Sequence, residues 1–152
     1  LKSLNYNARF IELASEINTN MPRFVVRKVQ DALNDNGKPV KDSDILILGV
    51  AYKADIDDVR ESPAIDVIQL LEHKGAKVSF HDPFVKQITH DSWSMDVIED
   101  FDSAVVNADC IVIVTNHSNY DYQHILDKAK LIVDTRNALG KIGRKNPKVV
   151  KL

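Results

Sequence analysis

The amino-acid sequence predicts an α/β fold with a doubly wound parallel sheet, preceded by a long N-terminal helix. Apolar residues recur at spacings of three and four over the first 34 residues. Beyond them, short uninterrupted apolar runs alternate with segments of helical periodicity. Apolar runs without polar alternation are typical of strands covered on both faces. Strands that alternate with helices imply right-handed crossovers between parallel neighbours.

The N-terminal segment is predicted to be helical because it carries a continuous apolar stripe. The stripe consists of Phe10, Leu13, Ile17, Met21, Phe24, Val25, Val29, Ala32 and Leu33. Asn36-Gly37 follows the stripe as a stop signal. Pro22 lies inside the stripe and cannot donate a hydrogen bond to the preceding turn, so it should kink or split the helix. We therefore expect one helix over residues 8–20 and a second over 22–34.

The later elements are predicted in alternating order. Ser62-Pro63 is typical of a helix start, with an N-cap followed by proline, and Gly75 is a typical stop. Two further helices are expected over residues 101–108 and 122–128, whereas residues 93–99 are ambiguous between strand and helix. The expected strands cover residues 45–50, 76–81, 110–115 and 131–134, with 149–150 as a further edge strand. This layout is Rossmann-like, and it divides the chain into a helical region, 1–36, and an α/β domain, 37–152.

Composition narrows the class of protein. The 152 residues are 44% hydrophobic and 28% charged, an ordinary balance for one soluble domain. The formal net charge of −2 gives no support for a nucleic-acid binder, and no stretch reaches the roughly 18 apolar residues of a membrane span. The single cysteine, Cys110, excludes an intrachain disulfide and favours a reducing, cytoplasmic location. The chain opens without Met or a signal peptide, which suggests a fragment of a longer protein or a trimmed terminus.

Residues 51–61, which follow the first predicted strand, are the strongest candidate for a binding site. Ligands of open α/β sheets bind beyond the carboxyl ends of the strands. This loop has about eleven residues where two to six are usual. It carries Lys53 and Arg60, which suit a phosphate group, and it ends at a helix N-terminus, which also favours an anion.

The aspartates of the same loop leave an alternative open. Asp55, Asp57 and Asp58 would then pair with the two cations on a solvated surface. A calcium site at these aspartates is disfavoured, because an EF-hand loop needs a glycine and a glutamate at set positions between two helices. We expect no metal here.

Arg136 follows the last strong strand and would project from the same rim as Lys53. Two cations from separate strand ends, converging on one crevice, would hold a diphosphate. The alternative is an arginine paired with Asp134 or Asp82. Neither residues 49–53 nor 140–143 have the three-glycine spacing of a dinucleotide-binding fingerprint.

Three further reactive side chains are interpreted as structural. Cys110 begins an apolar strand, where a cysteine is usually a small buried hydrophobic residue. His81 and His117 lie at strand ends on the rim, and we interpret both as core or loop residues rather than catalysts.

Two motifs of the α/β part occur at the predicted rim. They are residues 49–63, GVAYKADIDDVRESP, and residues 81–83, HDP. Together they resemble the UDP-binding domain of the UDP-glucose/GDP-mannose dehydrogenase family. Residues 8–22 resemble the long central helix of the same enzymes, and residues 109–118 and 133–136 fit later positions. The sequence of these motifs is most similar to the branch of the family that acts on UDP-N-acetylglucosamine or UDP-N-acetylmannosamine.

The resemblance implies a three-part enzyme that uses NAD to oxidise the C6 alcohol of a UDP-sugar to a carboxylate. In this family the reaction takes two hydride transfers and passes through a thiohemiacetal on a cysteine. The NAD fingerprint, the catalytic cysteine and the catalytic lysine would lie outside this chain, since Cys110 does not match the nucleophile. The chain would therefore contain no catalytic residue and would be inactive alone.

The resemblance also assigns roles by position. Tyr52, Lys53 and Arg136 match residues that bind the substrate, and Arg60 matches one that reaches NAD. Residues 1–36 match the end of the central helix, which implies a homodimer through this helix. The alternative function is a non-catalytic dimerising or regulatory α/β module.

Overall fold

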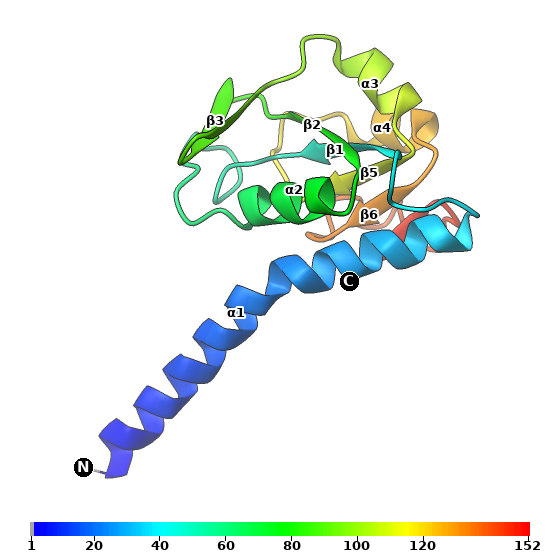
Figure 1. The fold of residues 1–152 in the computed structure, drawn as a ribbon. Helices are drawn as coiled ribbons and strands as arrows, with labels where there is room; N and C mark the ends of the chain where they lie inside the picture. Colours follow the sequence, from blue (N-terminus) through cyan, green and yellow to red (C-terminus); the bar gives the residue numbers. More distant parts are fainter. Residues whose placement is uncertain (1) are drawn as a thin grey trace.

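Five parallel strands form the centre of the fold (Figure 1). The computed structural model describes residues 2–152, with side chains from residue 8 onward. The sheet has the order β2-β1-β5-β6-β7, so β1 and β6 lie on either side of β5. Its strands are β1 (Asp44–Leu48), β2 (Lys77–His81), β5 (Cys110–Ile113), β6 (Ile132–Asp134) and β7 (Val149–Lys151). Because all four pairings are parallel, the five carboxyl ends meet at one rim, and the predicted fold class is confirmed.

Helices cover both faces of this sheet. The second half of α1 (Lys2–Asp35) and α2 (Pro63–His73) lie on one face, and α3 (Phe101–Asn107) and α4 (Tyr122–Lys128) lie on the other. In β1, Ile45 and Ile47 belong to the first core, whereas Leu46 and Leu48 belong to the second. Successive side chains of a strand point to opposite faces, which is why the run shows no polar alternation.

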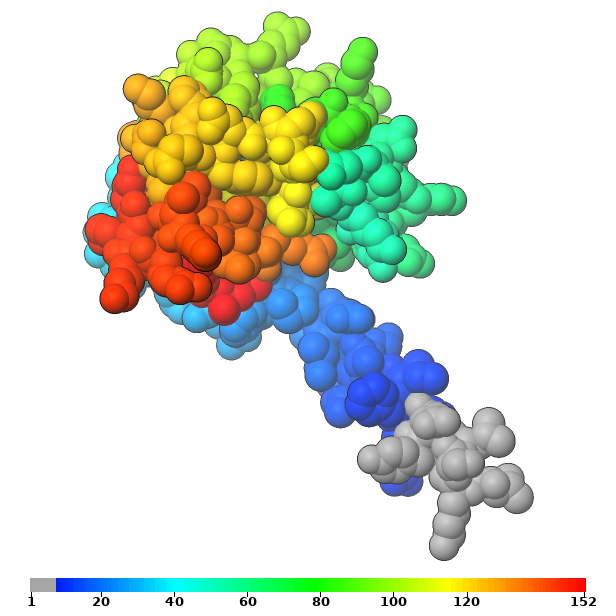
Figure 2. Space-filling view, turned by 180° about the vertical axis from the view of Figure 1, so that it is seen from behind, coloured from blue at the N-terminus to red at the C-terminus, as the bar shows by residue number. Residues whose placement is uncertain are grey.

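Helix α1 is continuous through Pro22, so the expected split into two helices is wrong. Figure 1 shows its axis changing direction midway, as proline in a helix commonly causes. The cost of the lost hydrogen bond is offset by burial of the following turns, where Val29 and Leu33 are fully covered by the sheet. Residues 8–20 project from the body as an arm (Figure 2). Phe10 and Ile11 on this arm are 69% and 66% exposed.

An antiparallel hairpin lies beside the main sheet and was not predicted. It consists of β3 (Gln87–His90) and β4 (Trp93–Asp96), so the ambiguous segment contains a strand. Trp93 Nε1 donates to Glu72 Oε2 at 3.1 Å and joins the hairpin to α2. Each strand has only four residues, too few for a period to be recognised. No helix among residues 2–152 is long and apolar enough to span a membrane.

Candidate functional site

The carboxyl ends of β1 and β5 approach each other closely at Gly49. Its φ is 80°, and a Cβ at this position would lie 2.3 Å from the carbonyl oxygen of Thr115. The amides of Val114 and Thr115 both donate to Leu48 O, at 2.9 and 3.2 Å. Only glycine adopts this conformation without a side chain in the way. Val50 and Thr115, predicted as strand residues, therefore belong to the rim loops.

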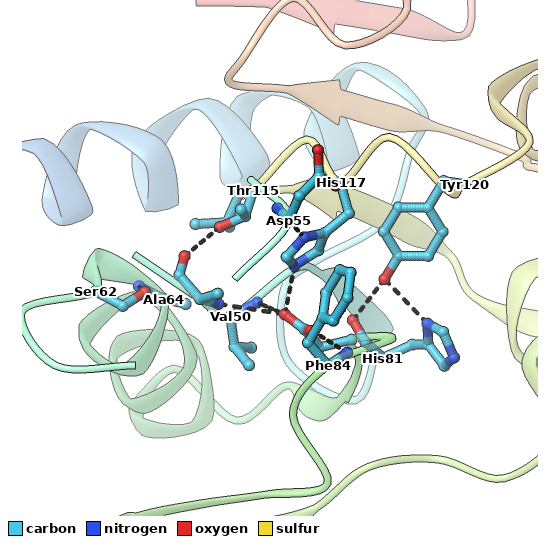
Figure 3. A network of polar contacts seen from close by, with 12 residues as sticks. Val50, Asp55, Ser62, Ala64, His81, Phe84, Thr115, His117 and Tyr120 are labelled. Carbon is cyan, nitrogen blue, oxygen red and sulfur yellow. Dashed lines mark hydrogen bonds and ion pairs between the residues drawn. The ribbon is translucent and has the colours of Figure 1, made fainter. Parts of the chain in front are cut away.

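A buried carboxylate–imidazole pair, Asp82 and His117, binds the first rim loop, which is the loop between β1 and α2. Figure 3 shows the His117 ring between Asp55 and Val50 of this loop. His117 Nε2 is 2.8 Å from Asp82 Oδ2, and both side chains are fully buried. The same oxygen accepts hydrogen bonds from the amides of Val50 and Ala51, at 2.8 and 3.2 Å. Asp82 Oδ1 accepts from the amide of Phe84 at 2.8 Å. The buried charge is thus compensated by four donors, as a buried carboxylate requires.

The other nitrogen of His117 binds the far end of the loop. The amide of Asp55 donates to His117 Nδ1 at 2.9 Å, so Nδ1 carries no proton and Nε2 donates to Asp82. The Asp55 carboxylate accepts from the amide and hydroxyl of Ser118, each at 2.8 Å. These two bonds hold the pKa of Asp55 below its usual value. Residues 50–55 are consequently bound at both ends. Figure 2 shows the loop that follows β1 and the loop that follows β5 side by side.

Tyr52 and Lys53 lie between these two anchors and point outward. Tyr52 is 42% exposed, and Lys53 Nζ lies 5.7 Å from the centroid of its ring. Lys53 forms no ion pair with any carboxylate in the part of the chain with described side chains. The expected alternative, pairing with the loop aspartates, therefore does not hold for Lys53. Its side chain is exposed to solvent.

Arg136 follows β6 and extends over the end of β5. Its Nε donates to Val114 O at 3.0 Å, and its amide donates to Asp134 Oδ1 at 3.1 Å. The Asp134 oxygens also accept from the amides of Ala138 and Leu139. Asp134 is thus satisfied by backbone amides, and the expected alternative of a side-chain ion pair with Asp134 or Asp82 is wrong. The axes of β1 and β6 are about 10 Å apart, two strand spacings, so Lys53 and Arg136 follow strands that are separated only by β5.

Arg60 differs from these two cations because it is paired. Its Nε and Nη2 lie 3.0 and 2.8 Å from the two oxygens of Asp58. This guanidinium lowers the pKa of Asp58 to about 2. Solvated pairing is thus confirmed for Arg60, and contact with NAD would require it to leave or share Asp58. The contact with NAD stays a prediction.

The remaining predicted structural residues have the expected surroundings. Cys110 is fully buried in β5, and burial raises the pKa of its thiol to about 12, as expected of a small core residue. His81 contacts Tyr120, whose hydroxyl donates to His81 O at 2.9 Å. Burial lowers the pKa of the His81 imidazole. His117 is a core residue as interpreted, but its link between two rim loops was missed.

Comparison with known proteins identifies the family. Residues 46–141 match the UDP-binding domain of the UDP-glucose/GDP-mannose dehydrogenase family. A UDP-N-acetyl-D-mannosamine dehydrogenase of Methanococcus maripaludis is 36% identical over 141 residues, which cover 88% of this chain and 31% of that protein. A UDP-glucose 6-dehydrogenase of Rickettsia bellii is 32% identical over 147 residues, 91% of this chain and 33% of that protein.

A solved structure supports the same relationship. The NDP-N-acetyl-D-galactosaminuronic acid dehydrogenase of Methanosarcina mazei superposes with a TM-score of 0.75 at 29% identity. The match covers 92% of this chain and 30% of the other. The chain thus spans less than a third of that protein's length, as it does for the mannosamine relative at 31%. From the family match and these relatives, the chain belongs to the UDP-glucose/GDP-mannose dehydrogenase family and contains its UDP-binding domain.

Proposed function

We propose that this chain is the nucleotide-binding part of an NAD-dependent dehydrogenase that oxidises the C6 alcohol of a UDP-sugar to a carboxylate. The observation that carries the proposal is Lys53, which forms no ion pair with any carboxylate of residues 8–152 and lies on a rim loop whose two ends are bound to the fold. A diphosphate placed beyond the rim would meet this ammonium without displacing a carboxylate. Such charge-assisted contacts bind and orient a ligand without taking part in its chemistry.

Arg136 would supply the second cation for the diphosphate. Its Nε is committed to Val114 O, which leaves both terminal nitrogens of the guanidinium available. A guanidinium edge matches the geometry of two phosphate oxygens. Tyr52, beside Lys53, would add an aromatic surface to the same site. We propose Tyr52, Lys53 and Arg136 as the substrate-binding residues of this chain.

Two observations on the described residues support binding of NAD mainly elsewhere in the protein. The freedom of Gly49 serves its approach to Thr115, and Arg60 is held by Asp58. We propose that NAD, the acceptor of the hydride, binds mainly to a part of the protein outside this chain, with Arg60 at its margin. The catalytic cysteine would lie there too, because buried Cys110 is unavailable for reaction. The chain alone is expected to show no dehydrogenase activity with UDP-sugar and NAD.

The relatives support a class of substrate, and the free thiol supports a cellular location. The mannosamine relative in particular supports a UDP-N-acetylhexosamine as the substrate. A reduced, buried cysteine and a nucleotide-linked substrate suit a cytoplasmic enzyme of polysaccharide biosynthesis.

The arm of α1 supports association of two copies. We propose that residues 1–36 are the end of a central helical region, and that the exposed Phe10 and Ile17 pack against a second chain. A Phe10→Asp change should shift the mass measured by light scattering toward the monomer. Glu12→Gln, a polar position on the same arm, should leave it unchanged. Equal masses for Phe10→Asp and the unaltered chain would contradict the dimer.

Calorimetry with UDP tests the main proposal. Removing a hydrogen bond to a charged group costs about 1.5–3 kcal/mol, so Lys53→Ala should weaken UDP binding about ten- to a hundredfold. Lys74→Ala removes an exposed lysine at the opposite end of α2 and should bind UDP normally. The proposal fails if the folded, unaltered chain gives no heat with UDP, or if Lys53→Ala binds UDP as tightly.

A further inference from the structure

We propose that His117 is a positioning residue for the loop that carries Tyr52 and Lys53, and that it acts only as the neutral imidazole protonated on Nε2. Protonation of Nδ1 would release the Asp55 end of this loop. The consequence for nucleotide affinity rests on the proposed function, whereas the consequence for the loop does not.

The first step is the position of the anchors. Val50 and Ala51 are bound by Asp82, and Thr115 Oγ1 donates to Ala51 O at 2.6 Å. The amide of Tyr52 then donates within the loop, to Asp58 O at 2.7 Å, and the next bond to another part of the fold is that of the Asp55 amide to His117 Nδ1. Figure 3 shows the imidazole between these two ends of the loop. The ring therefore binds the Asp55 end of the segment that carries Lys53, while Asp82 binds the other end.

The second step is the proton count on the ring. An amide N–H donates only to a nitrogen that has a lone pair, and a doubly protonated imidazole has none. If Nδ1 gained a proton, the Asp55 amide and the ring would present two donors to each other at 2.9 Å. The amide would have to move away or remain unsatisfied in a partly buried place. Its carboxylate would still hold Ser118, so the loop would be loosened rather than lost.

Several charged and titratable groups surround His117. The carboxylate of Asp82 touches Nε2. The carboxylate of Asp55 and the imidazole of His81 are the other charged or titratable groups that interact with the ring. Tyr120 contributes a ring at 6.1 Å, and Tyr122 donates its hydroxyl to His117 O. Nε2 stays bound to Asp82 in either protonation state, so a proton on Nδ1 changes the bond on the side of the loop.

Two conservative substitutions of His117 test the roles of its two ring nitrogens separately. In His117→Asn, the amide oxygen lies near the place of Nδ1 and can accept from the Asp55 amide. In His117→Gln, the amide nitrogen lies near the place of Nε2 and can donate to Asp82. Neither side chain titrates. A core histidine with no positioning role would make the two variants equivalent in their effect on the loop.

The experiment is nitrogen-15 NMR on the full chain over about pH 5 to 8, where histidines usually titrate. The ring spectrum of the unaltered protein should show the Nε2–H form at the high end. As His117 gains a proton, exchange of the Asp55 amide, corrected for its intrinsic rate, should rise about tenfold, the factor for one lost hydrogen bond. Exchange should stay slow in His117→Asn and be fast at every pH in His117→Gln.

Calorimetry with UDP over the same range completes the test. Affinity should fall about tenfold as His117 is protonated, and it should not follow this step in either variant. The proposal is overturned if the neutral ring carries its proton on Nδ1, or if the exchange rate of the Asp55 amide does not change when His117 is protonated. If UDP does not bind at any pH while Asp55 exchange follows His117, the positioning role stands and the proposed ligand is wrong.

Discussion

Replacement of Gly49 by alanine should destabilise the fold through two separate effects. Gly49 has a φ of 80°, and a non-glycine residue in the left-handed region costs about 1–2 kcal/mol. The new Cβ would also lie 2.3 Å from Thr115 O and 2.6 Å from Thr115 Cβ. A collision with the backbone of Thr115, in the loop that follows β5, is relieved only by moving that loop, which costs about 1–3 kcal/mol. We expect a total loss of about 3 kcal/mol.

Gly37→Ala is the matched control for this change. Gly37 has a φ of 72°, but no heavy atom lies within 4 Å of the position that a Cβ would take. Its replacement therefore carries only the conformational cost of about 1 kcal/mol. Urea unfolding of both variants, with equal m values, gives the two free energies of unfolding. If Gly49→Ala is no less stable than Gly37→Ala, the close approach of β1 and β5 is not a real constraint.

Three further outcomes are expected. The pKa of Asp58 measured by NMR should be about 2, because Arg60 binds the carboxylate. The stability that this pairing contributes should be fully present above pH 3.8 and should be lost as the pH falls through 2. Arg60→Gln should raise the pKa of Asp58, and an unchanged pKa would contradict the pairing. Cys110, with a thiol pKa raised to about 12, should react with a thiol reagent only after unfolding, and rapid reaction of the native chain would count against its burial. Ser62→Ala should lose about 1 kcal/mol of stability with the N-cap of α2, whereas the exposed Ser92→Ala should lose little.

Local sequence patterns predicted most of the sheet and the helices on it. The buried run of β1 and the proline start of α2 depend on neighbouring residues, so a short window contains the signal. Continuity of α1 through Pro22 depends instead on packing of its second half against the sheet, which no local pattern reports. The β3–β4 hairpin was missed because its strands are short and partly polar.

In the candidate site, too, local sequence patterns predicted some residues and missed others. Lys53 could be predicted because it lies in an unusually long loop after a buried strand. The pair of Asp82 and His117 could not, since 35 residues separate the two in the sequence. They meet only because β2 and β5 lie on either side of β1, an order that emerges from the folded sheet. A carboxylate and a histidine just after two predicted strands were the only sequence signal.

The length of the β1–α2 loop follows from this arrangement. A short turn would carry the chain directly from Leu48 to Pro63 and leave no segment to reach over the rim. The longer path exposes several backbone amides, and an unbound loop of this size would sample many conformations at an entropic cost to any ligand. Asp82 and His117, supplied by the two strands flanking β1, bind three of those amides. The backbone on either side of Lys53 is therefore held in place, as the proposed orientation of a diphosphate would require.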